Sequence, residues 1–311
     1  MGLLPAALAV ALLIDRLLGE PPACLHPVVA MGRYLHRLGP VLTRCAPAWA
    51  FTGGALAWLA GAAAVAALAW WVQRALVLLF DAWAAALLLG LALKPLLAWR
   101  MLAGEVRAVE DALAQSLDAG RARLSHLVSR DVAQLDEHAV RESAIESLAE
   151  NLCDSVVAPL FWFALAGLPG AALYRFANTA DAMWGYRGLR GGHDWTWAGK
   201  WAARADDVLS WLPARLTALT LGAGWAMRWH VLACEAARTP SPNGGWTMGA
   251  MALRLGVTLG KPGVYRLHAT ARAPGAADTA RALHVAGQGV LLAAAGCMAM
   301  QFALALGGLH A

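Results

Sequence analysis

Four carboxylates recur at every fourth position of the stretch ESAIESLAENLCDSVVAPLFW, and they are Glu142, Glu146, Glu150 and Asp154. On an α-helix this spacing stacks the four side chains on one slowly drifting face. Like charges four residues apart repel, so a helix that keeps them beside a membrane usually has a cation to offset the repulsion. Neighbouring serines and Asn151 add neutral oxygen ligands of the kind used in magnesium-assisted phosphate chemistry. The spacing therefore indicates either a divalent-cation site or a solvated acidic face.

Four further polar clusters stand out against an apolar background. Two lie in NTADAMWGY and ARADDVLSWLPAR, one forms the turn SPNGGW, and one lies near the N-terminus. Their polar residues are Asn178, Thr179 and Asp181; Arg204, Asp206, Asp207 and Arg215; Ser241, Asn243, Gly244 and Gly245; and Asp15, Glu20 and His26. Taken singly, each cluster has an ordinary explanation as a helix cap, a turn or a snorkelling arginine.

Taken together, the five clusters have a coherent chemistry. Carboxylates bind a divalent metal, arginines bind phosphate or carboxylate, and the backbone amides of a glycine turn can bind phosphate. This combination predicts phosphoryl or acyl transfer at a membrane face. The chain has no GxxxxGK(S/T) sequence, because Gly199–Lys200 lacks the earlier glycine and precedes a tryptophan, and this excludes a P-loop.

The composition places these clusters in a membrane protein. The chain has 311 residues, of which 59% are apolar and 14% are charged, whereas about 25% are charged in typical globular chains. Its mean hydropathy of +0.53 and long uncharged runs point to a polytopic protein of the lipid bilayer. Basic residues are scattered, which argues against nucleic acid as a partner. The five cysteines include no CxxC pair, which argues against a zinc site or a disulfide framework.

The hydropathy pattern predicts an all-α fold, a polytopic α-helical integral membrane protein with cytoplasmic helical segments and broken or re-entrant helices. We expect one domain over residues 1–311, with a polar helical insert at about 100–154. The predicted membrane segments are 3–18, 45–73, 75–99, 155–174, 208–227 and 282–309. The first lacks the basic n-region of a cleaved signal peptide and is interpreted as a retained segment. Asp81 interrupts the third, and an acid there should face protein or water.

The charges of the loops orient this chain. The polar segments after Arg100, Arg175 and Arg228 carry 6, 5 and 7 basic residues, so the positive-inside rule puts all three in the cytoplasm. Two apolar stretches, 155–174 and 208–227, separate these segments, and their prolines favour broken helices that line a cavity. Six plain spans with weak loop bias remain the alternative. We expect a multi-pass protein of the bacterial inner membrane whose site faces the cytoplasm.

On these motifs the sequence resembles the CobD/CbiB family of cobalamin biosynthesis, nearly end to end. The resemblance covers DRLLGEPP, HPVVAMG, SRDVAQLD, ESLAENLCDSVVAPLFW, NTADAMWGY, ARADDVLSWLPARLTA and SPNGGWTMGAMALRLGV. The order, spacing and number of the motifs make the match specific. The chain departs from the family at Ala180 and Ala182, where NTLDSM-type residues are usual, and at Ser210, where asparagine is common.

The resemblance implies an adenosylcobinamide-phosphate synthase. Such an enzyme forms an amide between adenosylcobyric acid, a corrinoid, and (R)-1-aminopropan-2-ol or its O-phosphate, with ATP and Mg²⁺ as expected cofactors. A carboxylate does not condense with an amine in neutral water, so we expect it to become an acyl phosphate first. On this resemblance we assign Glu146, Glu150 and Asp154 to magnesium. Arg204 and Arg215 are expected to hold phosphates or the corrinoid carboxylate.

The same resemblance assigns the remaining roles. Asp181 or Asp207 is expected to deprotonate the attacking ammonium, and Arg204 belongs with these two in the catalytic group. The predicted substrate- and phosphate-binding residues, beside Arg215, are Asn151, Asn178, Ser241, Asn243 and Gly244.

A second class of function stays open, a non-catalytic membrane sensor or transporter on the same scaffold. Asp15 and Asp81 are the kind of intramembrane acids that a proton-coupled transporter uses. Against this, the polar clusters concentrate in loops and at segment edges, and the sequence has no internal repeat of the transporter kind. ATP consumption that depends on both corrinoid and amine distinguishes the two classes.

Overall fold

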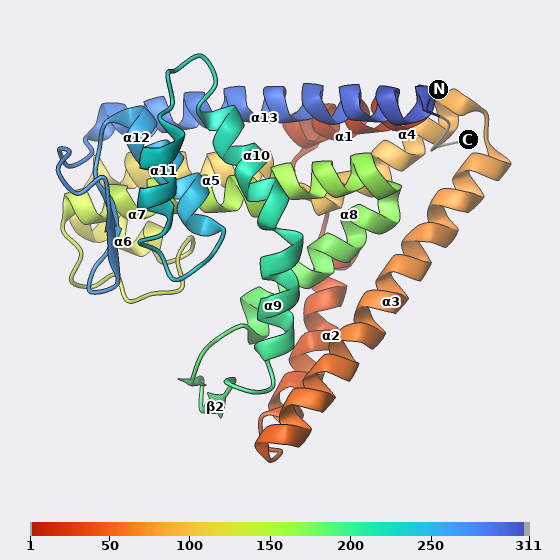
Figure 1. Ribbon diagram of the computed structural model, residues 1–311, viewed down its shortest axis with the longest axis horizontal. Coiled ribbons are helices and arrows are strands. Elements are labelled where there is room, and N and C mark those ends of the chain that lie inside the picture. The colour runs from red at the N-terminus through yellow and green to blue at the C-terminus, as the bar shows by residue number, and fades with distance from the viewer. Residues whose placement is uncertain (1, 308–311) are drawn as a thin grey trace. The chain divides into compact units, whose positions relative to one another are not determined.

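The computed structural model describes residues 2–307, and nearly all of its regular structure is helical (Figure 1). The described chain packs as two compact units. The first unit contains residues 2–98, 158–210 and 294–307, and the second contains residues 99–157 and 211–293. The all-α prediction is confirmed, since the β-strands within this range form two short hairpins.

The first unit contains α1 (Leu3–Leu18), α2 (Pro27–Leu42), α3 (Pro47–Leu79), α4 (Ala82–Leu93), η1 (Lys94–Leu96), α8 (Ala158–Trp184), β1 (Leu189–Arg190), β2 (His193–Asp194) and α9 (Lys200–Leu209). Helix α3 continues for 33 residues because no proline interrupts it after its first turn. The next helix begins at Asp81, whose Oδ1 accepts hydrogen bonds from the N–H groups of Trp83 (2.9 Å) and Ala84 (3.1 Å). The boundary predicted near residue 74 therefore falls at Asp81, which is an exposed helix cap.

Helix α8 is interrupted in its first half. Ala166 and Gly167 leave helical geometry, with a φ of 66° at Gly167. The Gln73 side chain of α3 fills the break, because its Oε1 accepts a 2.7 Å hydrogen bond from the Leu168 N–H. A Cβ at Gly167 would collide with the same side chain, so both the backbone conformation and the space require glycine. The break confirms the interrupted helix predicted in residues 155–174.

The second unit contains α5 (Trp99–Leu113), α6 (Leu117–Leu124), α7 (Glu137–Leu152), the π-helical turn η2 (Cys153–Val157), α10 (Trp211–Leu221), α11 (Trp229–Ala236), α12 (Gly244–Leu255), β3 (Leu259–Lys261), β4 (Tyr265–Leu267) and the first part of α13 (Ala276–Leu306). Helices α5, α6 and α7 occupy the predicted polar insert. Asp136 caps α7, because its Oδ1 accepts a 2.8 Å hydrogen bond from the Ala139 N–H.

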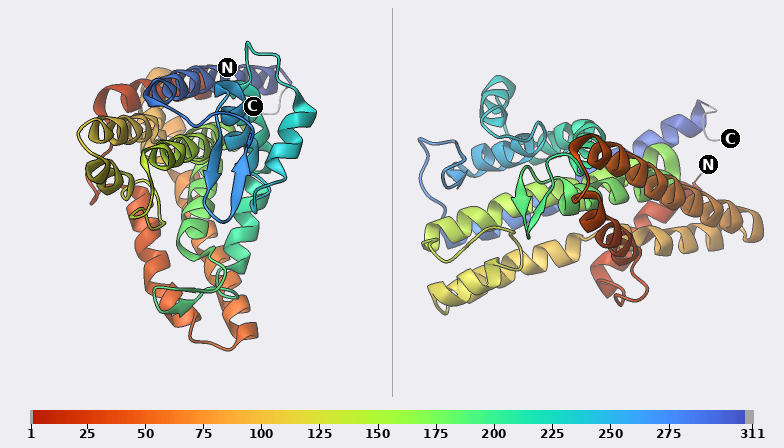
Figure 2. Two further views of the ribbon diagram at one scale, coloured as in Figure 1. Left: turned by 90° about the vertical axis from the view of Figure 1, so that its left-hand side faces the viewer. Right: turned by 90° about the horizontal axis from the view of Figure 1, so that it is seen from below.

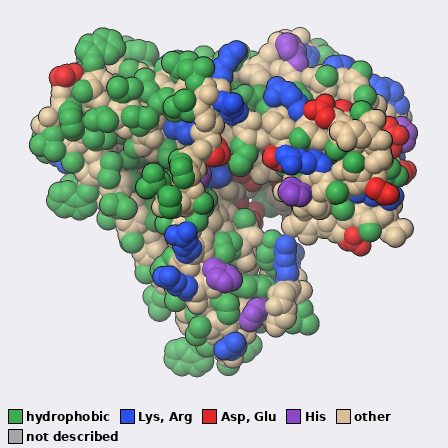
Figure 3. Space-filling model, turned by 180° about the vertical axis from the view of Figure 1, so that it is seen from behind, with side chains coloured by type: hydrophobic (Ala, Val, Ile, Leu, Met, Phe, Trp, Pro, Cys, Tyr) green, Lys and Arg blue, Asp and Glu red, His purple; other side chains and the backbone are tan. Residues whose placement is uncertain are grey.

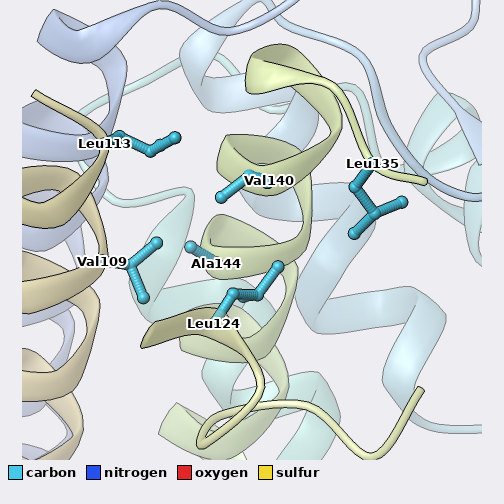
Figure 4. Close-up of a cluster of buried hydrophobic side chains, with 6 residues drawn as sticks. All are labelled: Val109, Leu113, Leu124, Leu135, Val140 and Ala144. Carbon is cyan, nitrogen blue, oxygen red and sulfur yellow. The ribbon is translucent and has the colours of Figure 1, made fainter. Parts of the chain in front are cut away.

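A hydrophobic cluster holds these three helices together (Figure 4). It contains Val109, Leu113, Leu124, Leu135, Val140 and Ala144. Leu124 and Val140 are fully buried, and burial of such a side chain stabilises the fold by about 1.5–3 kcal/mol. Beside the cluster, Glu110 accepts hydrogen bonds from Arg141 Nε (2.9 Å) and Thr279 Oγ1 (2.6 Å). This polar link joins α5 to α7 and α13.

Four helical runs among the described residues are long and apolar enough to cross a bilayer, and they are Pro47–Leu79, Ala82–Leu113, Glu137–Trp184 and Ala276–Leu306. The predicted segment 3–18 forms a helix of 16 residues, and 208–227 is broken at Ser210 before a helix of 11 residues. Both helices are shorter than the about 20 residues of a simple span. On the face drawn in Figure 3, hydrophobic side chains cover much of one part of the molecule, and charged side chains of both signs gather on another. The membrane-protein class is confirmed.

Candidate functional site

A polar cavity of about 310 Å³ lies in the second unit. Its charged lining consists of Glu146 and Glu150 of α7, Arg130 of the preceding loop and Lys261 of the β3–β4 hairpin, which stands beside α12 in Figure 2. Its neutral polar lining consists of Ser129, Ser147, Asn151, Thr239, Ser241 and Tyr265. Two carboxylates and two cations in one small cavity suit a ligand that carries both signs of charge.

Three carboxylates of the predicted acidic face lie on α7, and each has a different environment. Glu142 Oε1 accepts a 3.0 Å hydrogen bond from Thr258 Oγ1. One turn later, Glu146 Oε2 accepts a 3.0 Å hydrogen bond from Arg130 Nη2. A further turn on, Glu150 is exposed and lines the cavity. The bonds to Glu142 and Glu146 and the exposure of Glu150 to water thus reduce the repulsion between the carboxylates.

Glu146 is the buried member of the series, with 4% of its surface exposed. Its Oε1 has no hydrogen-bond partner in the part of the chain that the structure describes. Burial of a carboxylate oxygen without a donor is unfavourable, so this atom is a ready acceptor for a cation or an N–H group that enters the cavity. Burial, and then the charges of Glu146 and Glu150, raise the pKa of Tyr265, which therefore remains a hydroxyl donor at neutral pH.

Glu150 lies beside the turn that begins α12. A Cβ on Gly244 would lie 3.3 Å from Glu150 Oε1, so a side chain there would crowd the carboxylate. Ser241 Oγ accepts hydrogen bonds from the backbone N–H groups of Asn243 (3.2 Å) and Gly244 (3.1 Å). The sequence predicts that this turn binds phosphate through its amides, but Ser241 already occupies two of them. The positive end of the α12 dipole instead favours the Glu150 carboxylate.

Arg215 holds this turn in place. Its Nη1 donates to Asn243 Oδ1 at 2.6 Å, and its Nη2 donates to the Pro242 carbonyl at 3.1 Å. Its guanidinium also stacks on Trp211 and Trp246, at 4.6 Å and 4.8 Å from their ring centroids. The predicted role of Arg215 is to clamp an anion, whereas its observed partners belong to the protein. These contacts position the turn beside the cavity, and anion binding by Arg215 stays a prediction.

The predicted magnesium ligands do not share one environment. Asp154 lies in the π-helical turn and does not line the cavity that contains Glu146 and Glu150. Within residues 2–307, no group of three or more His, Cys, Asp or Glu side chains is placed to hold a metal ion. Asn151, which is predicted to bind substrate or phosphate, lines the cavity. Its Nδ2 donates to the Ser147 carbonyl at 2.9 Å.

The first unit contains the other predicted site residues, which are Asn178, Asp181, Arg204 and Asp207. Helices α8 and α9, which carry these residues, pack against each other. Asn178 Nδ2 on α8 donates to Asp206 Oδ1 on α9 at 3.5 Å. Burial raises the pKa of Asp207, and the positive charges of Arg204 and Arg187 oppose this rise.

The N-terminal polar cluster forms an ion network in the first unit. Lys94 Nζ lies 3.3 Å from Asp15 Oδ1 and 2.8 Å from Glu20 Oε1, and both Lys94 and Asp15 are buried. His26 Nε2 lies 3.2 Å from the second oxygen of Glu20. Asp15 is therefore paired with a lysine, and Asp81 is an exposed cap, so neither acid invoked for a transporter stands alone in an apolar span.

Sequence reasoning missed Arg130, Lys261 and Tyr265 as cavity residues. Arg130 belongs to the motif SRDVAQLD, whose position before an acidic helix is the signal that points to it. Lys261 and Tyr265 flank the dipeptide Pro262–Gly263, a turn signal that predicts a hairpin but not its partner helix.

The chain is similar in sequence to the members of one protein family. The family model described as CobD/Cbib protein matches residues 8–288. A protein of Chromobacterium violaceum named cobalamin biosynthesis protein CobD is 40% identical, with 98% of each chain covered. The Stutzerimonas stutzeri protein of the same name is 42% identical over 83% of this chain and 84% of its own. A probable CobD of Methanothermobacter thermautotrophicus is 38% identical over 84% and 86%. No solved structure matches. The chain belongs to the CobD/CbiB family.

Proposed function

We propose that this member of the CobD/CbiB family acts in cobalamin biosynthesis, as an ATP-dependent enzyme that joins adenosylcobyric acid to (R)-1-aminopropan-2-ol or its O-phosphate through an amide bond. The names of the relatives support the pathway. The mixed charge of the cavity in the second unit supports the reaction class. Phosphoryl transfer activates the corrinoid carboxylate as an acyl phosphate with release of ADP, and attack by the amine nitrogen then expels phosphate.

The observation that carries this proposal is the buried Glu146, whose Oε1 lacks a donor in a cavity that also contains Arg130 and Lys261. An ammonium group supplies donors to a carboxylate, and a phosphate accepts from arginine and lysine. An amine that carries a phosphate satisfies both halves of this cavity, so the lining favours the phosphorylated amine over the free alcohol.

Magnesium fits the same residues when phosphates are present. Mg²⁺ is usually held by one or two carboxylates together with substrate phosphates, and it keeps several waters. The exposed Glu150 is the carboxylate that would hold it, because the second oxygen of Glu146 is the acceptor for the ammonium group. The bound ion would neutralise phosphate charge. Arg130 orients Glu146, and Arg215 fixes the turn beside Glu150.

The test uses purified full-length protein in detergent with ATP-Mg, adenosylcobyric acid and each amine separately. We expect ATP consumption and an amide product only when corrinoid and amine are both present, with the phosphorylated amine used at lower concentration. Corrinoid binding without ATP consumption would instead support a sensor or transporter. ATP consumption that ignores the amine would contradict the ligase assignment.

A further inference from the structure

Two bands of exposed tryptophan mark a membrane-spanning length on α3. Trp49 is 74% exposed near its start, and Trp70 and Trp71 are 49% and 64% exposed near its end. Trp49 and Trp70 are 21 residues apart, or about 32 Å along a helix, close to the about 30 Å of a hydrocarbon core. Tryptophan is enriched at both membrane interfaces. Trp49 therefore marks one interface level of the first unit.

The segment Tyr186–Lys200, which we call the interfacial hairpin, is held at this level. It contains β1 and β2, and Figure 1 shows it at the end of the first unit where α2 meets α3. The Ala198 carbonyl touches Gly54 of α3 so closely that any Cβ at Gly54 would collide with it. Gly54 is five residues, about 8 Å, from Trp49. The contact fixes the hairpin beside the Trp49 end of α3.

This end of the first unit is basic. Its exposed cationic or titratable side chains include Arg33, His36, Arg37, Arg44, Arg187 and Arg190. None of these six makes an ion pair within the described chain. The single acid of the hairpin, Asp194, accepts hydrogen bonds from the N–H (2.9 Å) and hydroxyl (2.6 Å) of Thr196. Lys, Arg and His side chains gather at the lower end of the view in Figure 3.

A cavity of about 430 Å³ opens within the basic end. Its lining combines cationic or titratable groups with aromatic rings, among them His36, Arg190, His193, Tyr186, Trp184 and Trp195. The Arg190 guanidinium stacks 3.6 Å above the Tyr186 ring. Stacking uses the face of a guanidinium and leaves its N–H edges free to bind a phosphate through two parallel bonds. The cavity thus presents phosphate donors beside apolar rings.

We propose that this cavity and the interfacial hairpin bind the phosphate headgroup of an anionic phospholipid. Arg190, which lines the cavity, would contact the phosphate, and the exposed Arg187 would add positive charge from the same hairpin. Leu189 between them, 81% exposed, would enter the apolar boundary. The unpaired basic charge, the interface level set by Trp49 and the aromatic lining each match a headgroup with its acyl chains attached. This inference concerns the first unit and is independent of the proposed reaction.

The experiment uses full-length protein in bilayers of equal phosphatidylglycerol and phosphatidylcholine, with native mass spectrometry to count the retained lipids. Wild type should retain phosphatidylglycerol in preference to phosphatidylcholine, and the preference should fall as salt rises. Arg187→Gln with Arg190→Gln should weaken retention by about fivefold per arginine. Arg107→Gln is the matched control, since Arg107 is exposed on α5 in the second unit and loses the same charge.

Several outcomes would overturn the proposal. They are equal retention of the two lipids by wild type, equal loss in Arg107→Gln, and complete displacement of phosphatidylglycerol by inorganic phosphate. The last would assign the cavity to a soluble phosphate. The comparison of phosphatidylglycerol with phosphatidylcholine uses the wild-type protein alone. It therefore tests the proposal even if the double variant misfolds.

Discussion

Arg130 Nη2 donates a 3.0 Å hydrogen bond to one carboxylate oxygen of Glu146, and the other oxygen has no donor within residues 2–307. The pair is largely buried, with 17% of the Arg130 side chain and 5% of the Glu146 side chain exposed. Arg130 therefore neutralises the charge of Glu146 without saturating its hydrogen bonds. A ligand that donates to the second oxygen gains a hydrogen bond there. The Tyr265 hydroxyl, which shares the cavity and interacts with the same carboxylate, is the protein group that competes with such a ligand.

Arg130→Gln should lower the free energy of unfolding by about 2–3 kcal/mol. The loss is below the 3–5 kcal/mol of a fully buried pair because Arg130 is partly exposed. Adding Glu146→Gln should recover most of this loss, since no uncompensated charge then remains in the core. Denaturant unfolding of the four proteins in detergent measures the coupling. Additive effects of the two substitutions would contradict the pairing.

Glu150→Gln should lower the rate of amide formation by at least about tenfold, which corresponds to 1.4 kcal/mol in the barrier, with the fold intact. The substitution keeps the shape of the side chain and removes a carboxylate that lines the cavity. High magnesium should rescue part of the loss if Glu150 holds the ion. Asp111→Asn, at an exposed position of α5, is the control and should keep normal activity. Normal activity in Glu150→Gln would support the alternative interpretation, in which the carboxylates of α7 form a solvated acidic face without a metal ion.

Arg215→Lys should leave expression and membrane insertion unchanged but reduce the use of ATP or corrinoid markedly. Lysine keeps the charge, but it cannot bond Asn243 and Pro242 together while stacking on two tryptophans. Rates across substrate concentrations, compared with those of Arg254→Lys on α12, measure the effect. A normal rate with a normal KM would show that the position needs only a positive charge.

The segments that contain Glu146, Asp181, Asp207 and Asn243 should all face the cytoplasm. ATP and both proposed substrates are cytoplasmic, and the basic bias of the loops agrees. Single-cysteine variants labelled from each side of the membrane test this, and the exposed native Cys234 of α11 provides a first position. Labelling of any of these segments from the periplasmic side would contradict the prediction that all four face the cytoplasm.

Features that depend on local sequence were predictable. Hydropathy indicated a helical membrane protein, and proline and glycine placed a break inside 155–174, where Ala166 and Gly167 leave helical geometry. The i, i+4 spacing placed Glu142, Glu146 and Glu150 on one helix. Asp154 followed the same spacing, but the chain enters a π-helical turn at Cys153, and no local sequence signal marks that change of register.

Features that depend on remote packing were not predictable. Lys261 and Tyr265 reach the cavity because a hairpin more than a hundred residues after α7 packs against that helix. The anion-binding role of Arg215 stays a prediction, and sequence cannot show that its guanidinium also donates to Asn243 and Pro242. The predicted site residues fall into two units, and the composition of the sequence does not indicate this division. Each unit is assembled from stretches that are far apart in the chain.

The side chain of Gln73 that fills the break in α8 also constrains the order in which the protein can be assembled. The Leu168 N–H needs an acceptor from another helix, because an unsatisfied backbone group in lipid costs several kcal/mol. Synthesis from the N-terminus delivers α3 to the membrane before α8, so the acceptor is in place when the interrupted helix leaves the ribosome. A circularly permuted chain that is translated from α8 onward would insert the break before its acceptor is present, so this helix should insert less efficiently than in the native order.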